Sequence, residues 1–232
     1  AASAERKKTL AALGAKLWLT PSSLGVDGAI ELAYQTAKDK PEEYFLPDQY
    51  NNPNNPLAHY YGTSLEIWQQ TKGEITHFVA AMGTSGTLMG NGRRLRELNP
   101  DCEVVCVEPY LGHKIQGMKN LTEAYIPGIF DKSVITSKVR VDDDAAFDMA
   151  RNLAKKHGLF VGMSAGAAVA GAVNLASQIE KGVIVVLLPD GGDRYLSTSL
   201  FTVDEDVETS ASPKLSFLNT LTRKVEPFKP IA

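Results

Sequence analysis

Apolar and polar residues follow two different periods along the first 202 residues. Continuous apolar runs rich in β-branched residues are typical of strands that are buried on both faces of a parallel sheet. The longest of these runs are 75–82 ("ITHFVAAM"), 102–109 ("CEVVCVEP") and 182–190 ("GVIVVLLPD"). Segments with apolar residues at helical spacing alternate with them, at 85–100, 144–158 and 164–179. This alternation predicts an α/β fold with a parallel sheet covered by helices on both faces.

The first 50 residues repeat the alternation on a smaller scale. Helical spacing in "AERKKTLAALG" and "DGAIELAYQTAKDK" is interleaved with the short apolar stretches "AKLWLT" (15–20) and "YFLP" (44–47), which predict strands. The chain has no initial Met and begins just before a helix cap at Ser3, which predicts that an N-terminal part has been removed. We therefore expect residues 1–50 to be the remnant of a small α/β domain that is unstable or leaves an exposed sheet edge, and residues 51–202 to be a large α/β domain.

The pattern changes after residue 202. Residues 203–213 ("VDEDVETSASP") are acidic and then small and polar, without periodicity, which predicts a linker. Residues 214–232 regain alternation, as the start of a second domain would.

Composition narrows the function classes. The formal charge of −3 supplies no basic surface for nucleic acid. No apolar run approaches the roughly 20 residues that a membrane span needs, and no secretory signal is present, so we expect a cytoplasmic protein. The only cysteines, Cys102 and Cys106, are four strand steps apart, about 13 Å. That separation exceeds the limit of about 7 Å for a disulfide, so we expect both thiols to pack in the core. The four histidines have no mutual spacing that indicates a metal site.

A glycine-rich loop, "GTSGT", joins the apolar run 75–82 to the following helix. A loop of this kind points backbone N–H groups at one spot beyond the carboxyl end of a strand, where open α/β sheets bind ligands. Gly83 and Gly86 allow close approach, and Thr84, Ser85 and Thr87 offer hydroxyl groups. A phosphate monoester fits this loop best. A tight turn without a ligand stays an alternative. The glycine spacing differs from the dinucleotide fingerprint, although Glu108 imitates its acidic residue, and no Lys follows as in a Walker loop.

Many motifs in one order resemble the fold type II pyridoxal-phosphate enzymes, and within them the B-type branch of the cysteine synthases. The motifs include "SAERKKTLAALGA", "YFLPDQYNNPNNPLAH", "GTSGT", "YIPGIF", "GMSAGA" and "DGGDRYLSTSLF", and the resemblance runs from Ala2 to about Thr202. It implies pyridoxal 5'-phosphate as the cofactor, small-molecule substrates, and a homodimer, since members of the family are typically dimers.

The resemblance implies roles for particular residues. Gly83, Thr84, Ser85, Gly86 and Thr87 match the loop that holds the cofactor phosphate. Ser164 matches the serine that hydrogen-bonds the pyridine nitrogen, although an N-cap of the following helix is the alternative. Gln49 matches a glutamine near the amino-acid carboxylate, and exposed loop polarity explains it equally well. Lys119 matches a basic residue that meets an anionic sulfur donor, and a solvated surface lysine is the alternative.

The reaction that the resemblance implies is β-replacement on an activated serine by a sulfur nucleophile, giving cysteine. The lysine that binds the cofactor in this family lies upstream of the segments matched here, and none of the lysines of this chain corresponds to it. We therefore assign no catalytic residue to these 232 residues. A cystathionine β-synthase and a non-catalytic scaffold domain remain alternatives, the latter because residues 214–232 resemble the start of a cysteinyl-tRNA synthetase.

Overall fold

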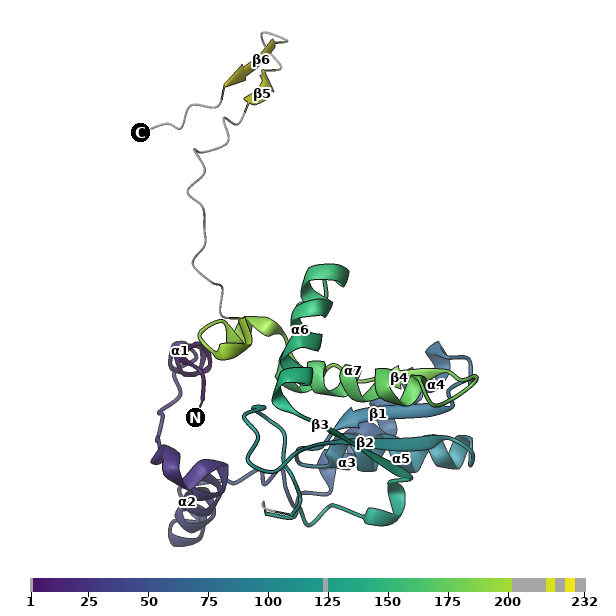
Figure 1. The fold of residues 1–232 in the computed structure, drawn as a ribbon. Helices are drawn as coiled ribbons and strands as arrows, with labels where there is room; N and C mark the ends of the chain where they lie inside the picture. The colour runs from purple at the N-terminus through teal and green to yellow at the C-terminus, as the bar shows by residue number, and fades with distance from the viewer. Residues whose placement is uncertain (1, 123–124, 202–215, 220–223, 228–232) are drawn as a thin grey trace. The chain divides into compact units, whose positions relative to one another are not determined.

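Four parallel strands form the central sheet of the protein (Figure 1). The computed structural model describes residues 2–122, 125–201, 216–219 and 224–227. The strands are β1 (His77–Ala81), β2 (Glu103–Pro109), β3 (Ser137–Val141) and β4 (Ile184–Val186), and their order in the sheet is β3-β2-β1-β4. The registers Val79↔Val105, Val79↔Val186 and Val107↔Val139 align all four. The predicted parallel sheet is confirmed.

Helices cover both faces of this sheet. One face packs on α5 (Gly86–Leu98), and the other packs on α7 (Met163–Ala176), which α6 (Asp143–His157) covers in turn. Alternate strand residues face opposite layers because successive side chains of a strand point to opposite sides. Phe78, Ala80 and Val104 therefore belong to the α5 layer, and Val79 and Val105 to the α7 layer. Figure 1 shows α5 and α7 on opposite sides of the sheet.

The helix limits agree with the sequence where capping residues mark them. The Asp142 side chain accepts a hydrogen bond from the Ala145 N–H at the start of α6, and Gly158, with φ of 67°, ends the helix. The predicted cysteine packing is also confirmed, since Cys102 and Cys106 are free and buried in the α5 layer. Burial raises the pKa of the Cys102 thiol to about 11 and that of the Cys106 thiol to about 12.

Two strand predictions need correction. Strand β3 was not expected, although its burial alternates along "SKVRV" as on a sheet edge. The run 182–190 contributes only the three residues of β4, which are half-buried because β4 pairs with β1 alone among the described strands. Val161 forms one isolated bridge with Gly191.

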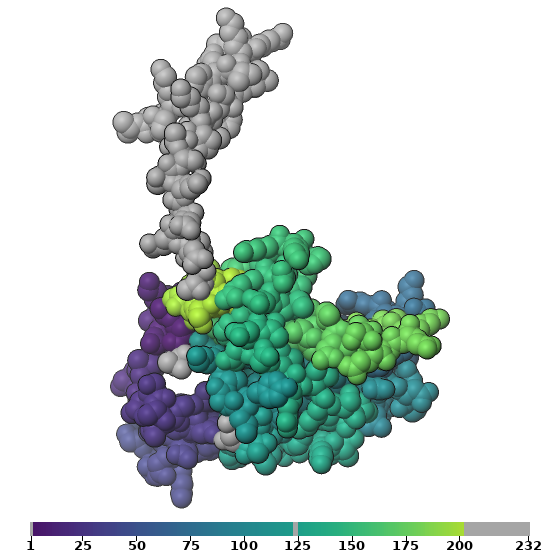
Figure 2. Space-filling model, in the orientation of Figure 1, coloured from purple at the N-terminus to yellow at the C-terminus, as the bar shows by residue number. Residues whose placement is uncertain are grey.

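The first 50 residues contain α1 (Ala4–Ala12) and α2 (Gly25–Asp39), with the short 3₁₀ helix η1 (Ser22–Leu24) between them. The strands expected at 15–20 and 44–47 are absent from these described residues. Neither α1 nor α2 contains a buried residue, and Leu13 and Phe45 are 79% and 87% exposed. A strand needs a hydrogen-bonded neighbour, and the described segments supply none here. In the space-filling view this N-terminal part, in purple, borders the large body and is partly separated from it by an opening (Figure 2).

The remaining elements complete the two compact units, residues 1–201 and 202–232. In the first unit, α3 (Asn54–Ala58), the π-helical turn η2 (His59–Thr63) and α4 (Ser64–Gln70) pack beside α5, and the 3₁₀ turns are η3 (Lys132–Val134), η4 (Gly192–Tyr195) and η5 (Ser199–Phe201). In the second unit, β5 (Ser216–Asn219) and β6 (Lys224–Pro227) form an antiparallel hairpin. The predicted linker lies outside the described residues. The domain boundary at residues 50 and 51 stays a prediction. None of the helices in the described part of the chain has both the length and the apolarity of a membrane span.

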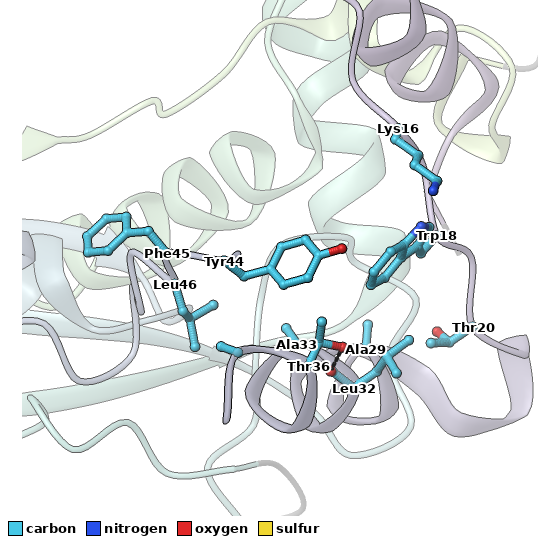
Figure 3. Close-up of a pocket in the computed structure, with 11 residues that line it drawn as sticks. Lys16, Trp18, Thr20, Ala29, Leu32, Ala33, Thr36, Tyr44, Phe45 and Leu46 are labelled. Carbon is cyan, nitrogen blue, oxygen red and sulfur yellow. Dashed lines mark hydrogen bonds between the residues drawn. The ribbon is translucent and has the colours of Figure 1, made fainter. Parts of the chain in front are cut away.

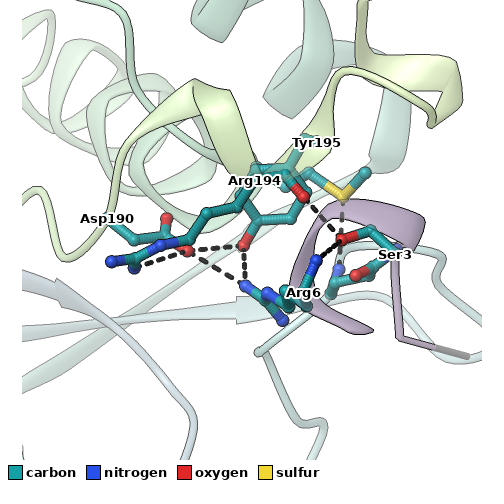
Figure 4. A network of polar contacts seen from close by, with 7 residues as sticks. Ser3, Arg6, Asp190, Arg194 and Tyr195 are labelled. Atoms are coloured by element: carbon teal, nitrogen blue, oxygen red, sulfur yellow. Dashed lines mark hydrogen bonds and ion pairs between the residues drawn. The ribbon is translucent and has the colours of Figure 1, made fainter. Parts of the chain in front are cut away.

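Polar contacts attach α1 to η4 (Figure 4). The Ser3 hydroxyl caps α1 by accepting from the Arg6 N–H and also donates to the Arg194 carbonyl at 2.6 Å. The Arg6 guanidinium donates to Asp190 Oδ2 at 3.1 Å and to the Tyr195 hydroxyl at 2.6 Å, and it lies over the Tyr195 ring. Burial raises the pKa of Tyr195, so its hydroxyl stays protonated and donates to Asp190 at 2.7 Å.

We expect the substitution Gly90→Ala to destabilise the fold. A Cβ at Gly90 would lie 2.1 Å from the backbone carbonyl oxygen of Pro56, because α5 and α3 touch there. Overpacking of this kind costs about 1–3 kcal/mol. The control is Gly62→Ala, where no atom lies within 4 Å of the added Cβ. Urea denaturation should show a lowered midpoint for Gly90→Ala alone, and equal midpoints for both variants would contradict the packing of α5 on α3.

We also expect Arg6→Ala to release α1 while the sheet stays folded. No apolar residue of α1 is buried, so polar contacts carry the attachment, namely those of Arg6 and Ser3 and the hydrogen bond from the Ser197 hydroxyl to Glu5. Loss of a hydrogen bond to a charged group costs about 1.5–3 kcal/mol, so amide exchange of residues 4–12 should accelerate by about tenfold or more. Lys8→Ala, an exposed change on the same helix, is the control. Unchanged exchange in Arg6→Ala would show that another contact holds α1.

Candidate functional site

The loop between β1 and α5 lies at the carboxyl edge of the sheet and forms a cradle, which we define as residues 83–87. Gly83 is required by packing, since a Cβ there would lie 2.9 Å from the Gly117 carbonyl oxygen. A Cβ at Gly86 would lie 1.9 Å from Asn55 Oδ1, so it would displace the Asn55 side chain from its present position. The absence of side chains at Gly83 and Gly86 therefore accommodates other parts of the protein, namely the Gly117 carbonyl and the Asn55 side chain.

Ser85 occupies an unusual backbone conformation at the centre of the cradle. Its φ of 71° lies in the left-handed region, at the N-cap position of α5, and its side chain makes no capping hydrogen bond. The residue is 3% exposed, and its hydroxyl is buried without a hydrogen-bond partner. The first N–H groups of α5 start at the next residue and precede the first intrahelical bond. Together they form a set of donors that fits an anion such as a phosphate group.

Neighbouring side chains fix the two threonines of the cradle. Asn55 Nδ2 donates to Thr84 Oγ1 at 3.1 Å and to the Gln49 carbonyl at 2.6 Å. His59 Nε2 lies 3.2 Å from Thr87 Oγ1. Burial lowers the pKa of His59, so the imidazole is neutral at pH 7 and supplies a hydrogen bond to the cradle without a positive charge.

Asn55 and His59 are contacts that the sequence analysis did not identify. The density of Asn and Pro in "NNPNNP" was a signal of a structured loop, but nothing local shows that Asn55 would touch Thr84, 29 positions away. Gln49 is exposed, and its carbonyl reaches the cradle through Asn55. Its side chain makes a hydrogen bond with Tyr50, and its role with a substrate carboxylate stays a prediction.

Ser164 lies at the start of α7, on the opposite face of the sheet from α5. The alternative interpretation of Ser164 as the N-cap is wrong, because the N-cap of α7 is Gly162 and Ser164 is the second residue of the helix. Val161, just before α7, bridges Gly191, which follows β4. The start of α7 therefore lies at the same carboxyl edge as the cradle. Ser164 is 7% exposed, and its role toward a pyridine ring stays a prediction.

Lys119 is buried, and its backbone is hydrogen-bonded to the residue that precedes the cradle. Its N–H donates to the carbonyl of Met82, the residue before Gly83, at 2.8 Å. The alternative of a solvated surface lysine is wrong, since Lys119 is 6% exposed and its Nζ lies 2.7 Å from Asp27 Oδ1. Glu108, which imitated the acidic residue of a dinucleotide site, instead receives a hydrogen bond from Leu121 N–H and pairs with Lys138.

An apolar groove of about 350 Å³ lies apart from the cradle, in the first 50 residues (Figure 3). Trp18 and Tyr44 face each other across it in an edge-to-face contact, above Ala29, Leu32 and Ala33 of α2. Apolar side chains dominate its lining, and a phosphate group requires donors. The cradle is therefore the better anion site. No group of metal-ligating side chains occurs among the residues with described positions.

Comparison with known proteins agrees with this geometry. Residues 1–190 match the family model described as pyridoxal-phosphate dependent enzyme. The chain is 49% identical over 209 residues to a cysteine synthase of Aquifex aeolicus, covering 88% of this chain and 64% of the relative. It is 43% identical to cysteine synthase B of Escherichia coli, covering 86% of this chain and 65% of that protein. The chain thus spans about two thirds of the length of these relatives.

Solved structures give the same assignment. A crystal structure of O-ureido-L-serine synthase superimposes with a TM-score of 0.81 at 39% identity, covering 89% of this chain and 68% of that one. The cysteine synthase of Entamoeba histolytica gives a TM-score of 0.78 at 36% identity, with 88% and 63% covered. Because the family model matches residues 1–190 and the relatives share this α/β fold, the chain belongs to the family of pyridoxal-phosphate-dependent enzymes.

Proposed function

We propose that this chain supplies the phosphate- and ring-binding part of a cysteine synthase. The enzyme replaces the β-substituent of an activated serine with a sulfur nucleophile. The observation that carries the proposal is the buried, unpartnered hydroxyl of Ser85, beside the first N–H groups of α5. The identities of 40–49% to cysteine synthases support this choice of reaction.

The residues of the chain have defined tasks in this proposal. Gly83, Thr84, Ser85, Gly86 and Thr87 bind the cofactor phosphate through N–H and hydroxyl donors. Asn55 and His59 hold the two threonines in place. A neutral His59 leaves the charge of the phosphate to be balanced by N–H groups and the N-terminal end of α5.

The Ser164 hydroxyl donates a hydrogen bond to the pyridine nitrogen. A hydroxyl does not hold a proton on that nitrogen as a carboxylate does, so the ring withdraws electrons less strongly. When bound, pyridoxal phosphate supplies the electron sink for β-elimination and addition. Gln49 and Lys119 belong to the substrate side of the site, near the carboxylate and the sulfur donor.

The proposal extends to the cell and to assembly. We place the enzyme in the cytoplasm, because free buried thiols suit a reducing compartment, and as a homodimer, as the family resemblance implies. A cystathionine β-synthase would use the same cradle with homocysteine as the second substrate. The chain is also similar to an O-ureido-L-serine synthase, a protein whose named product is not cysteine. A synthase with another product is therefore a further alternative.

The proposal is tested by binding experiments on the 232-residue chain. Ser85→Ala should weaken the binding of both pyridoxal phosphate and inorganic phosphate by about ten- to a hundredfold, since a hydrogen bond to a charged group contributes about 1.5–3 kcal/mol. Ser164→Ala should weaken pyridoxal phosphate only, because inorganic phosphate does not reach the ring. Calorimetry and phosphorus NMR measure both ligands.

The matched control is Ser177→Ala, at the exposed end of α7. A folded chain that binds neither ligand, or equal losses in Ser85→Ala and Ser177→Ala, would refute the assignment of the cradle. The reaction itself is measured on a polypeptide in which the chain follows the lysine-bearing segment of the Aquifex aeolicus cysteine synthase. Preference for sulfide over homocysteine is expected, and the reverse preference would support the cystathionine β-synthase alternative.

A further inference from the structure

A buried ammonium group lies beside the site with a carboxylate as its counter-ion. The Lys119 side chain is 7% exposed, and its Nζ donates to Asp27 Oδ1 at 2.7 Å. The same Nζ lies 5.1 Å from the centroid of the buried Tyr50 ring. A buried charge is costly unless it is paired, so this geometry requires an anion at the position of the Asp27 carboxylate.

The position of Lys119 belongs to the proposed substrate side of the site. Its own N–H is bonded to Met82, which precedes the cradle. Tyr50, under its ammonium group, follows Gln49, whose carbonyl is linked through Asn55 to Thr84. Two separate connections thus link the segments that carry Lys119 and Tyr50 to the cradle.

Asp27 differs from Lys119 in how it is held. It projects from α2, whose 15 residues include none that is buried. Its side chain is 43% exposed, and its second oxygen receives only a long hydrogen bond of 3.4 Å from the Tyr125 N–H. Water already reaches Asp27, so moving its carboxylate fully into water costs little, whereas the ammonium group depends on a partner.

Helix α2 keeps another attachment when Asp27 moves. The Tyr34 hydroxyl donates to Asp48 and accepts from Asn51 Nδ2 at 2.7 Å. Asn51 in turn accepts from the Gly128 N–H at 3.1 Å. The Asp27 side chain can therefore leave Lys119 by a local rotation, without unfolding of α2.

We propose that Asp27 is a specificity-determining residue: its carboxylate occupies the anion position at Lys119, and a small anionic co-substrate binds there only by displacing it. The inference rests on the proposed function for the identity of the co-substrate, but the competition between Asp27 and an external anion does not. A doubly charged oxyanion competes better than a monovalent carboxylate, because it brings more charge to a site shielded from water. Asp27 thereby favours compact, doubly charged anions over neutral ligands.

The test measures the reactivity of the Lys119 amine. This readout distinguishes an anion bound at Lys119 from an anion bound in the cradle. The intact chain is treated with a lysine-acetylating ester, with and without sodium sulfate, and acetylation is measured for each lysine by mass spectrometry. Sodium chloride at equal ionic strength controls for screening. Lys119 should react at least about tenfold more slowly than exposed lysines in the same digest, because its amine is shielded and paired.

Asp27→Asn should accelerate acetylation of Lys119 by about tenfold and should lower the sulfate concentration that protects it by about tenfold or more. Glu31→Gln is the matched control, since it removes one negative charge from an exposed position of the same helix. Asp27→Ser also removes the carboxylate, with a smaller side chain, and should have the same effect as Asp27→Asn. Substitution Lys119→Met should leave the acetylation of the other lysines unchanged.

Equal protection by sulfate in the unaltered chain and in Asp27→Asn would overturn the proposal, because Asp27 would then not compete. Absence of sulfate protection in every variant would overturn it as well, because Lys119 would not be an anion site. These outcomes are independent of cofactor binding. A chain that fails to bind pyridoxal phosphate but shows the difference between Asp27→Asn and Glu31→Gln refutes the proposed function and leaves the competition intact.

Discussion

The close approach of backbone segments at the end of β1 is the constraint on which the site depends. The Gly117 carbonyl approaches the chain at Gly83, the Asn55 side chain at Gly86, and the Pro56 carbonyl at Gly90. A Cβ at Gly83 or at Gly90 would collide with a backbone carbonyl, and a Cβ at Gly86 would displace the Asn55 side chain. Because these contacts lie within the folded chain, the cradle is shaped before any ligand binds, as the preorganisation of an anion site requires.

The two parts of the first compact unit are held together by different forces. The body around the sheet is closed by apolar packing on both faces of the strands. The first 50 residues are attached to it mainly by polar contacts, of which the Arg6 pair with Asp190 and the Lys119 pair with Asp27 are examples. Polar contacts exchange with water and with ligands more easily than buried apolar surface does. Ligand-dependent changes are therefore expected where α1 and α2 meet the body, while the sheet stays rigid.

The sequence predicted the parts of the fold that local patterns determine. The β1 run, the glycine turn and the start of α5 were recognised because continuous apolar residues followed by Gly and Thr specify a buried strand and a helix end. The expected strands at 15–20 and 44–47 failed, because strand formation depends on a neighbour that local sequence does not reveal. Strand β3 was missed because its short alternating pattern is not specific for a strand. It forms a strand because it pairs with β2.

The same limit applies to the site. The cradle residues follow one another along the chain and were found as a motif. Asn55, His59 and Asp27 reach the site from other elements, 28 to 92 positions away from the site residues that they contact, and their residue types are common on surfaces. Burial excluded the interpretation of Lys119 as a solvated surface lysine, and the cap geometry excluded Ser164 as the N-cap. The roles of both residues toward ligands stay predictions.

Ser85 carries an energetic argument that the motif alone does not. A residue other than glycine in the left-handed region costs about 1–2 kcal/mol, and a buried hydroxyl without a partner costs about 1–3 kcal/mol. Glycine at this position would avoid both costs and would keep the backbone N–H. Costs of this size are large beside a net stability of about 5–15 kcal/mol. A ligand oxygen that accepts from the hydroxyl offsets the second cost, and a charged acceptor offsets more of it than a neutral one does. The energetics of Ser85 therefore favour an anionic ligand group, independently of the family resemblance.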